Sequence, residues 1–182
     1  AGLLGNGQTA LELFLGGMYG GFQVLLANPL SGREILAYVI KHSETKILFV
    51  AHQYQELAEQ ALSQLSNKPE IILNHPDNLP AWNDTVPVKN LLKYIPNPKE
   101  KALLIYTSGT TGRPKGVIHT HESLLYGGWN TEVAHELTPD DNSLCVLPLY
   151  HINAQVVSVM GTLVNGSGLV MPQRFQASKF WF

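Results

Sequence analysis

The residues best suited to chemistry by type and spacing lie in one short segment, 106–116, which reads Tyr-Thr-Ser-Gly-Thr-Thr-Gly-Arg-Pro-Lys-Gly. The segment holds four aliphatic hydroxyls, three glycines and one lysine, namely Thr107, Ser108, Thr110, Thr111, Gly109, Gly112, Gly116 and Lys115. Glycine permits backbone conformations in which successive amides converge on an anion, while hydroxyls donate hydrogen bonds and the lysine adds positive charge. The segment therefore predicts a phosphate-binding loop.

The spacing differs from that of the P-loop of nucleotide kinases. That motif needs Gly-x-x-x-x-Gly-Lys-Ser/Thr followed by a helix. Here Lys115 comes three residues after Gly112 and is followed by Gly116 and an apolar run typical of a strand. The usual P-loop interpretation is therefore excluded.

Segment 106–116 instead resembles the signature loop of the adenylate-forming (AMP-binding) superfamily, which includes acyl-CoA synthetases, firefly luciferase and peptide-synthetase adenylation domains. The family pattern is Tyr/Phe-Thr-Ser-Gly-Ser/Thr-Thr-Gly-x-Pro-Lys-Gly, and every fixed position is matched. The resemblance implies ATP-dependent activation of a carboxylic acid as an acyl-adenylate, followed by transfer to a thiol, usually that of coenzyme A. It also implies that residues 107–112 and Lys115 bind the phosphates, that Lys115 offsets their charge, and that Thr107 offers its hydroxyl to Mg²⁺ or hydrogen-bonds the loop.

A second segment, Leu147-Pro-Leu-Tyr-His-Ile-Asn153, resembles the strand-to-helix junction where this family places an aromatic side chain or a histidine beside the acyl group. The resemblance implies that His151 packs against the activated carboxyl and gates the thiol; the alternative is a histidine that caps the following helix. Peptide-synthetase domains carry an aspartate here, and none occurs between residues 145 and 155. The acyl-CoA synthetase branch, acting in fatty acid metabolism, is therefore favoured.

The resemblance extends along the whole chain but covers only part of the family's length. It implies an internal piece of the large N-terminal domain, cut at both ends and lacking the rest of that domain and the small C-terminal domain. The 182-residue chain is thus expected to bind nucleotide weakly and to form no thioester. Tyr126, Trp129 and Asn153 are candidates for the near wall of the acyl pocket, with core packing as the alternative, and a homo-oligomer is possible.

Strands and helices alternate along the chain, which predicts an α/β fold with mostly parallel sheets and covering helices. Strands are expected at 1–4, 22–27, 46–51, 71–73, 102–106, 116–119, 144–147 and 168–171. Helices are expected from residue 8 through 18, 31–42, 54–65, 88–94, 120–135, 152–163 and from 177 onward, the second opened by a capping box of Ser31 and Glu34. The predicted organisation is an α/β subdomain at 1–74, a proline-rich connecting segment at 75–98, and a second α/β subdomain at 99–182 that carries the loop.

Composition excludes several classes of protein. The chain is 45% hydrophobic and 14% charged with a net charge of −2, which rules out disorder and gives no basic footprint for nucleic acid. Cys145 is the single cysteine, so neither an intrachain disulfide nor a cysteine-rich zinc site can form, and the cytoplasm is the expected location. The apolar stretch 13–30 is interrupted by glycine pairs, which favours a buried helix and strand over a transmembrane segment.

Three other interpretations remain open. Gly5-Asn-Gly-Gln-Thr-Ala10 imitates the Gly-x-Gly-x-x-Ala fingerprint of NAD(P)-dependent oxidoreductases, although Asn28 stands where an acidic ribose ligand would end the next strand. His119 and His121 could form a metal pair, although capping and surface roles are favoured because zinc needs more ligands. A non-catalytic scaffold that kept the fold is the third, and the intact loop argues against it.

Overall fold

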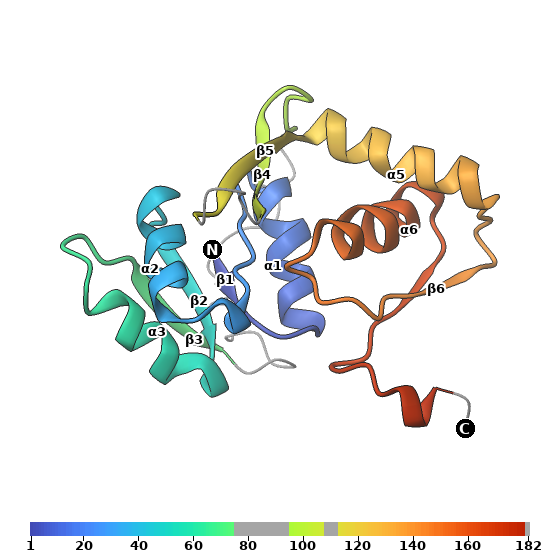
Figure 1. Cartoon of the computed structure of the whole chain (residues 1–182). Coiled ribbons are helices and arrows are strands. Elements are labelled where there is room, and N and C mark those ends of the chain that lie inside the picture. The colour runs from blue at the N-terminus through green and yellow to red at the C-terminus, as the bar shows by residue number, and fades with distance from the viewer. Residues whose placement is uncertain (75–94, 108–112, 181–182) are drawn as a thin grey trace, which may run out of the picture.

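The computed structural model describes residues 1–74, 95–107 and 113–180 and has an α/β fold (Figure 1). The first half contains β1 (Gly2–Leu3), α1 (Gln8–Tyr19), the 3₁₀ turn η1 (Pro29–Ser31), α2 (Arg33–His42), β2 (Ile47–Ala51), η2 (His52–Tyr54), α3 (Gln55–Leu62) and β3 (Glu70–Asn74). The second half contains β4 (Lys101–Thr107), β5 (Lys115–Thr120), α5 (His121–His135), β6 (Asn142–Leu144), the π-helical segment η3 (Ala154–Met160), α6 (Gly161–Asn165), β7 (Gly168–Val170) and η4 (Ala177–Lys179). The helix expected at 88–94 lies outside the described residues.

Two of the three described sheets are parallel, as the alternation of elements predicts. β1, β2 and β3 form one parallel sheet in sequence order, and β6 and β7 pair in parallel. β4 and β5 form an antiparallel hairpin that ends beside the phosphate-loop segment. The α/β fold class with mostly parallel sheets is therefore confirmed.

The apolar run at 22–27 joins the first sheet to the hairpin. It forms parallel bridges to both, Gly2 with Leu26 and Val24 with Leu103, rather than the regular strand that was expected. The Val24 amide donates to the Ala102 carbonyl, and the Leu104 amide donates to the Val24 carbonyl, each at 2.8 Å. This run thus fixes the position of β4 relative to β1.

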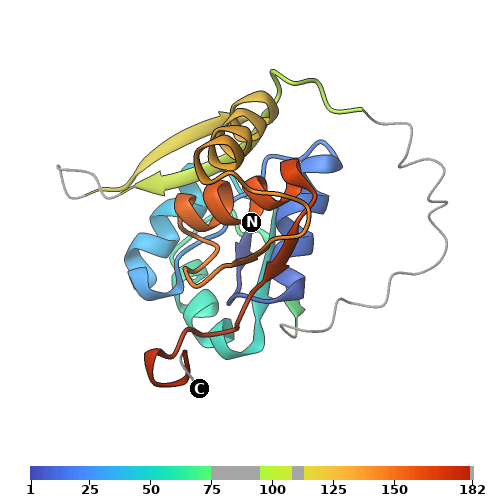
Figure 2. The same ribbon diagram turned by 90° about the vertical axis from the view of Figure 1, so that its right-hand side faces the viewer.

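Two apolar cores hold these layers together. The larger contains residues of α1, the 22–27 run, β4, α5 and η3, with Phe14, Leu103 and Leu124 fully buried. The smaller is built around α2, β2 and α3. Figures 1 and 2 show α5 lying alongside α6, and the larger core spans both sides of the expected connecting segment, so the division of the chain at 75–98 stays a prediction.

Several local expectations were wrong in detail. The predicted capping box is absent: the Ser31 hydroxyl donates to the Asn28 carbonyl, and α2 starts after Gly32 with no side-chain cap. Asn28 is the residue that caps, because its Oδ1 accepts from the Leu30 amide at 2.8 Å and starts η1. The Ser31 hydroxyl bonds to Asn28 within the turn at 28–31, so it does not cap α2.

Other boundaries also moved. The strand expected at 144–147 lies earlier in the chain, as β6, and ends at Leu144, where its pairing with β7 ends. The helix expected at 152–163 contains the π-helical stretch η3 and continues as α6 to Asn165, where Gly166 ends it with a positive φ of 78°. The helix expected from Ala177 is a single 3₁₀ turn in the part described.

Candidate active site

The β4–β5 hairpin brings two of the predicted phosphate-binding residues together. In the antiparallel register Thr107 lies opposite Lys115, and Tyr106 lies opposite Gly116. Ala102 and Leu103 of β4 are buried in the larger core, while Thr107 and Lys115 are exposed at the end of the hairpin. Ser108, Gly109, Thr110, Thr111 and Gly112 lie outside the described residues, so their contacts with phosphate stay predictions.

Contacts with α2 hold the base of this loop on both of its sides. The Tyr106 hydroxyl lies 2.6 Å from His42 Nδ1, and the ring of His42 stacks on Tyr38 with centroids 5.3 Å apart. On the other side of the loop, the guanidinium carbon of Arg113 lies 5.8 Å from the centroid of the Tyr38 ring. The loop is therefore anchored through side chains that the sequence analysis did not single out.

Burial raises the pKa of Tyr106 to about 12, and the neighbouring Tyr38 adds to the shift. Since the folded protein holds this proton more tightly than the unfolded chain, the stabilising contribution is complete below the ordinary tyrosine pKa of about 10 and is lost as the pH rises through the folded pKa. We expect the difference in tyrosinate absorbance between the wild type and Tyr106→Phe to show its transition near pH 12. A transition near pH 10 instead, the ordinary range of tyrosine, would contradict this environment.

The second predicted segment folds as a turn that leads into η3. The His151 amide donates to the Pro148 carbonyl at 2.9 Å, and the His151 carbonyl accepts from the Gln155 amide at 3.2 Å. The His151 side chain is exposed and its ring lies 4.6 Å from that of Tyr150. His151 is thus free of the core and accessible, as contact with a substrate requires, and its role stays a prediction.

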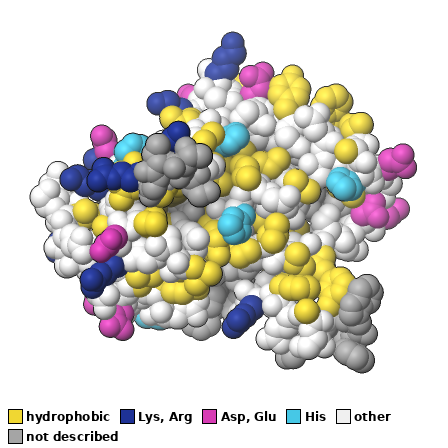
Figure 3. Space-filling view, viewed as in Figure 1, with side chains coloured by type: hydrophobic (Ala, Val, Ile, Leu, Met, Phe, Trp, Pro, Cys, Tyr) yellow, Lys and Arg dark blue, Asp and Glu magenta, His cyan; other side chains and the backbone are white. Residues whose placement is uncertain are grey.

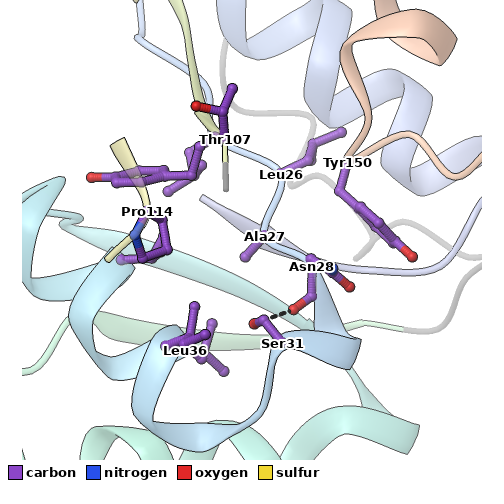
Figure 4. A pocket seen from close by; sticks show the side chains of 12 residues that line it. Leu26, Ala27, Asn28, Ser31, Leu36, Thr107, Pro114 and Tyr150 are labelled. Atoms are coloured by element: carbon purple, nitrogen blue, oxygen red, sulfur yellow. Dashed lines mark hydrogen bonds between the residues drawn. The ribbon is translucent and has the colours of Figure 1, made fainter. Parts of the chain in front are cut away.

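A cavity of about 250 Å³ joins these two segments. Its lining combines the 22–28 run, α2, the base of the loop and the turn before η3: Leu25, Leu26, Ala27, Asn28, Ser31, Ile35, Leu36, Val39, Tyr106, Thr107, Pro114 and Tyr150. Figure 4 shows Thr107 and Pro114 on one side of the cavity and Tyr150 on the other, with Leu26 and Ala27 between them. A loop residue and the neighbour of His151 therefore face one apolar cavity, although they are 43 positions apart in the sequence (150 − 107).

The described residues offer limited means to hold a metal ion. No group of three or more His, Cys, Asp or Glu side chains suited to a metal occurs in the described ranges. His121 is the first residue of α5, and His119 Nδ1 lies 3.5 Å from the hydroxyl of Ser123, which shares a capping box with Thr120. His119 near the end of β5 and His121 at the start of α5 thus flank the capping box of α5, and Thr107 is the single predicted Mg²⁺ ligand that the structure describes.

The three candidates for the acyl-pocket wall lie away from this cavity. Tyr126 and Trp129 are half exposed on α5, with ring centroids 6.4 Å apart, and Asn153 is exposed. The core-packing alternative is wrong for these residues.

The surface of the molecule gives two further observations. Figure 3 shows apolar side chains gathered in the middle of one face and charged ones mostly towards its rim. Within the described ranges no helix has the length and apolarity needed to cross a membrane.

Comparison with protein families decides the identity of the fold. The chain matches the family model described as AMP-binding enzyme over residues 1–182. The chain belongs to the AMP-binding enzyme family. The resemblance that the loop indicated is therefore confirmed, and the dinucleotide-binding interpretation of residues 5–10 is not needed.

Individual members of the family agree with this assignment. The chain is 40% identical over 180 residues to a sulfoacetate–CoA ligase of Cupriavidus necator, an alignment that covers 98% of this chain and 35% of the relative. It is 30% identical over 155 residues to an oxalate–CoA ligase of Arabidopsis thaliana, covering 81% of this chain and 30% of that relative. The chain thus spans about a third of the length of these curated AMP-binding enzymes.

A solved structure has the same fold as this chain. ATP-bound MatB from Rhodopseudomonas palustris superposes with a TM-score of 0.78 at 23% identity, covering 98% of this chain and 35% of that one. At this identity the match concerns the fold alone. The match covers 98% of this chain and therefore includes the hairpin, α2 and η3.

Proposed function

We propose that the protein to which this chain belongs is an ATP-dependent carboxylate–CoA ligase. A carboxylate oxygen would attack the α-phosphorus of ATP and the bond to pyrophosphate would break, which leaves an acyl-adenylate. The coenzyme A sulfur would then attack the acyl carbon, lose its proton to a base or to solvent, and release AMP. The observation that carries the proposal is the cavity with Thr107 on one side and Tyr150, next to His151, on the other.

The chain's own residues would supply charge and orientation. Two anions must approach each other in the first step, so fixed donors and positive charge near the phosphates lower the barrier. Lys115 at the end of the hairpin would offset the charge of the phosphates, and the Thr107 hydroxyl lies opposite it in the register. Mg²⁺, when bound, would share that charge, with Thr107 as one neutral ligand and the phosphate oxygens as others. His151 would contact the acyl group from the other side of the site.

We infer that the substrate is a small polar carboxylate. The relative at 40% identity is a sulfoacetate–CoA ligase, and the relative at 30% identity is an oxalate–CoA ligase. This inference replaces the expectation of fatty acid metabolism, while the cytoplasm and a homo-oligomer stay predictions. The test is carboxylate-dependent exchange of labelled pyrophosphate into ATP, followed by thioester formation, with sulfoacetate, oxalate and octanoate as substrates. Activity with octanoate alone would contradict the substrate class, and no exchange with any carboxylate would contradict the function.

The 182-residue chain by itself is expected to show no exchange above background. Its described residues contain no group of three or more His, Cys, Asp or Glu side chains suited to a metal, and the chain spans about a third of the length of its relatives. The measurement compares this chain with the whole protein in the same exchange assay. Clear carboxylate-dependent exchange by the short chain would show that it already holds all the residues that adenylation needs.

A further inference from the structure

One buried side chain ties the first turn of the chain to the segment that carries His151. The Asn6 amide nitrogen donates to the Leu147 carbonyl at 3.0 Å, and Asn6 Oδ1 accepts from the Leu149 amide at 2.8 Å. Asn6 is only 8% exposed. A hydrocarbon side chain at this position would leave a buried backbone N–H without its partner, which is costly.

A second side-chain amide, that of Gln155, also bonds to the backbone of Leu149. Gln155 Nε2 donates to the Leu149 carbonyl at 2.6 Å, and the Gln155 side chain is fully buried. Both the N–H and the C=O of Leu149 are thus bonded to side-chain amides rather than to a strand or helix. Tyr150, which lines the cavity, and His151 follow directly.

We propose that Asn6 is a positioning residue for the turn that presents Tyr150 and His151 to the reacting groups. The proposal rests on the proposed function for the contact of His151 with substrate. The hydrogen bonds of Asn6 to Leu147 and Leu149 do not depend on that function. A reacting group displaced by about 1 Å can lower a rate by roughly a hundredfold, so a side chain that fixes this turn affects catalysis without contacting substrate. Residues 5–7 imitate a dinucleotide fingerprint, and the proposal gives Asn6 a positioning role in its place.

The first test measures positioning without activity. In Asn6→Ala of the whole protein, peptides that cover 147–151 are expected to exchange their amide hydrogens about tenfold faster, while the rest of the chain exchanges as in the wild type. Asn165→Ala is the matched control, because Asn165 Nδ2 also donates to a distant backbone carbonyl, that of Leu137 at 2.7 Å, far from the turn in sequence. Unchanged exchange at 147–151, or an equal increase everywhere, would overturn the proposal.

The second test asks whether the effect passes through His151. Asn6→Ala is expected to lower kcat about tenfold in the wild-type background and less than about twofold in a His151→Ala background, with the KM for ATP unchanged, because residues that act as a unit are not additive. A full tenfold loss in both backgrounds would overturn a role through His151. A His151→Ala variant with wild-type rates would instead refute the proposed contact of His151, leaving the exchange result to judge Asn6.

Asn6→Asp covers the case in which Asn6→Ala does not fold. The aspartate keeps the volume and the acceptor for the Leu149 amide but loses the donor to the Leu147 carbonyl. Amide hydrogen exchange at 147–151 should then rise, but by less than when both hydrogen bonds of Asn6 are lost. Exchange identical to that of the wild type would overturn the proposal.

Discussion

Replacing Lys115 with alanine in the whole protein should lower the rate of pyrophosphate exchange by about a hundred- to a thousandfold, the usual effect of removing one preorganised donor to developing charge. Lys115 is exposed at the end of the β4–β5 hairpin, opposite Thr107, so its ammonium is available to a phosphate. The melting temperature should stay within a few degrees of the wild type, because exposed side chains contribute about 0.5 kcal/mol or less to folding.

Lys101 provides the matched control for Lys115. It is exposed on the same hairpin, at the opposite end of β4, where it pairs with Thr120. Lys101→Ala removes the same charge from the same sheet and should leave the exchange rate within about twofold of the wild type, because charge effects at exposed sites are screened over about 10 Å. A wild-type rate in Lys115→Ala would contradict the role of Lys115 in offsetting the charge of the phosphates, and no exchange in the wild type itself would favour a non-catalytic scaffold that kept the fold.

Replacing Gly128 with valine should lower the free energy of unfolding by about 3 kcal/mol, the upper end for overpacking of a tight core. Gly128 is buried in α5, and a Cβ there would lie 2.5 Å from the carbonyl oxygen of Met160 in η3. Because that neighbour is backbone rather than a flexible side chain, the two helices must move apart to relieve the clash. Denaturant unfolding monitored by circular dichroism measures the loss.

Gly16 is the matched control for Gly128. It is also a helical glycine, exposed in α1, and no heavy atom lies within 4 Å of a Cβ built on it. Gly16→Val should therefore change the unfolding free energy by about 0.5 kcal/mol or less, in the stabilising direction, since valine has the better helix propensity. Equal losses at both positions would contradict the close approach of α5 and η3 as the cause of the loss at Gly128.

Much of the candidate site could be predicted from local sequence because its signals are local. Segment 106–116 carries its own pattern of hydroxyls, glycines and a lysine, and the apolar runs on either side predict the two strands of the hairpin. His151 was singled out through the resemblance of a short segment, 147–153, to the family, and its role stays a prediction. Periodicity also predicted the α/β class, since alternating strands and helices bury their apolar faces in few other ways.

Other parts could not be predicted because they depend on which of several local hydrogen bonds forms, or on contacts between distant residues. The competition that replaced the Ser31 capping box with an Asx turn at Asn28 involves groups a few positions apart, and sequence alone does not rank such alternatives. The contact of His42 with Tyr106 joins residues 64 positions apart. Nothing in the local pattern of α2 marks His42 as a partner of the loop.

The sequence by itself determined the α/β class and the family and predicted a phosphate-binding loop, because residue type, spacing and the alternation of elements carry that information. Only the tertiary structure decided that Thr107 and Tyr150 face one cavity, and that Asn6 holds the turn before His151 across more than 140 positions. The physical reason is that a buried polar group must find a hydrogen-bond partner wherever the packing of the layers brings one, and that packing is a property of the whole chain.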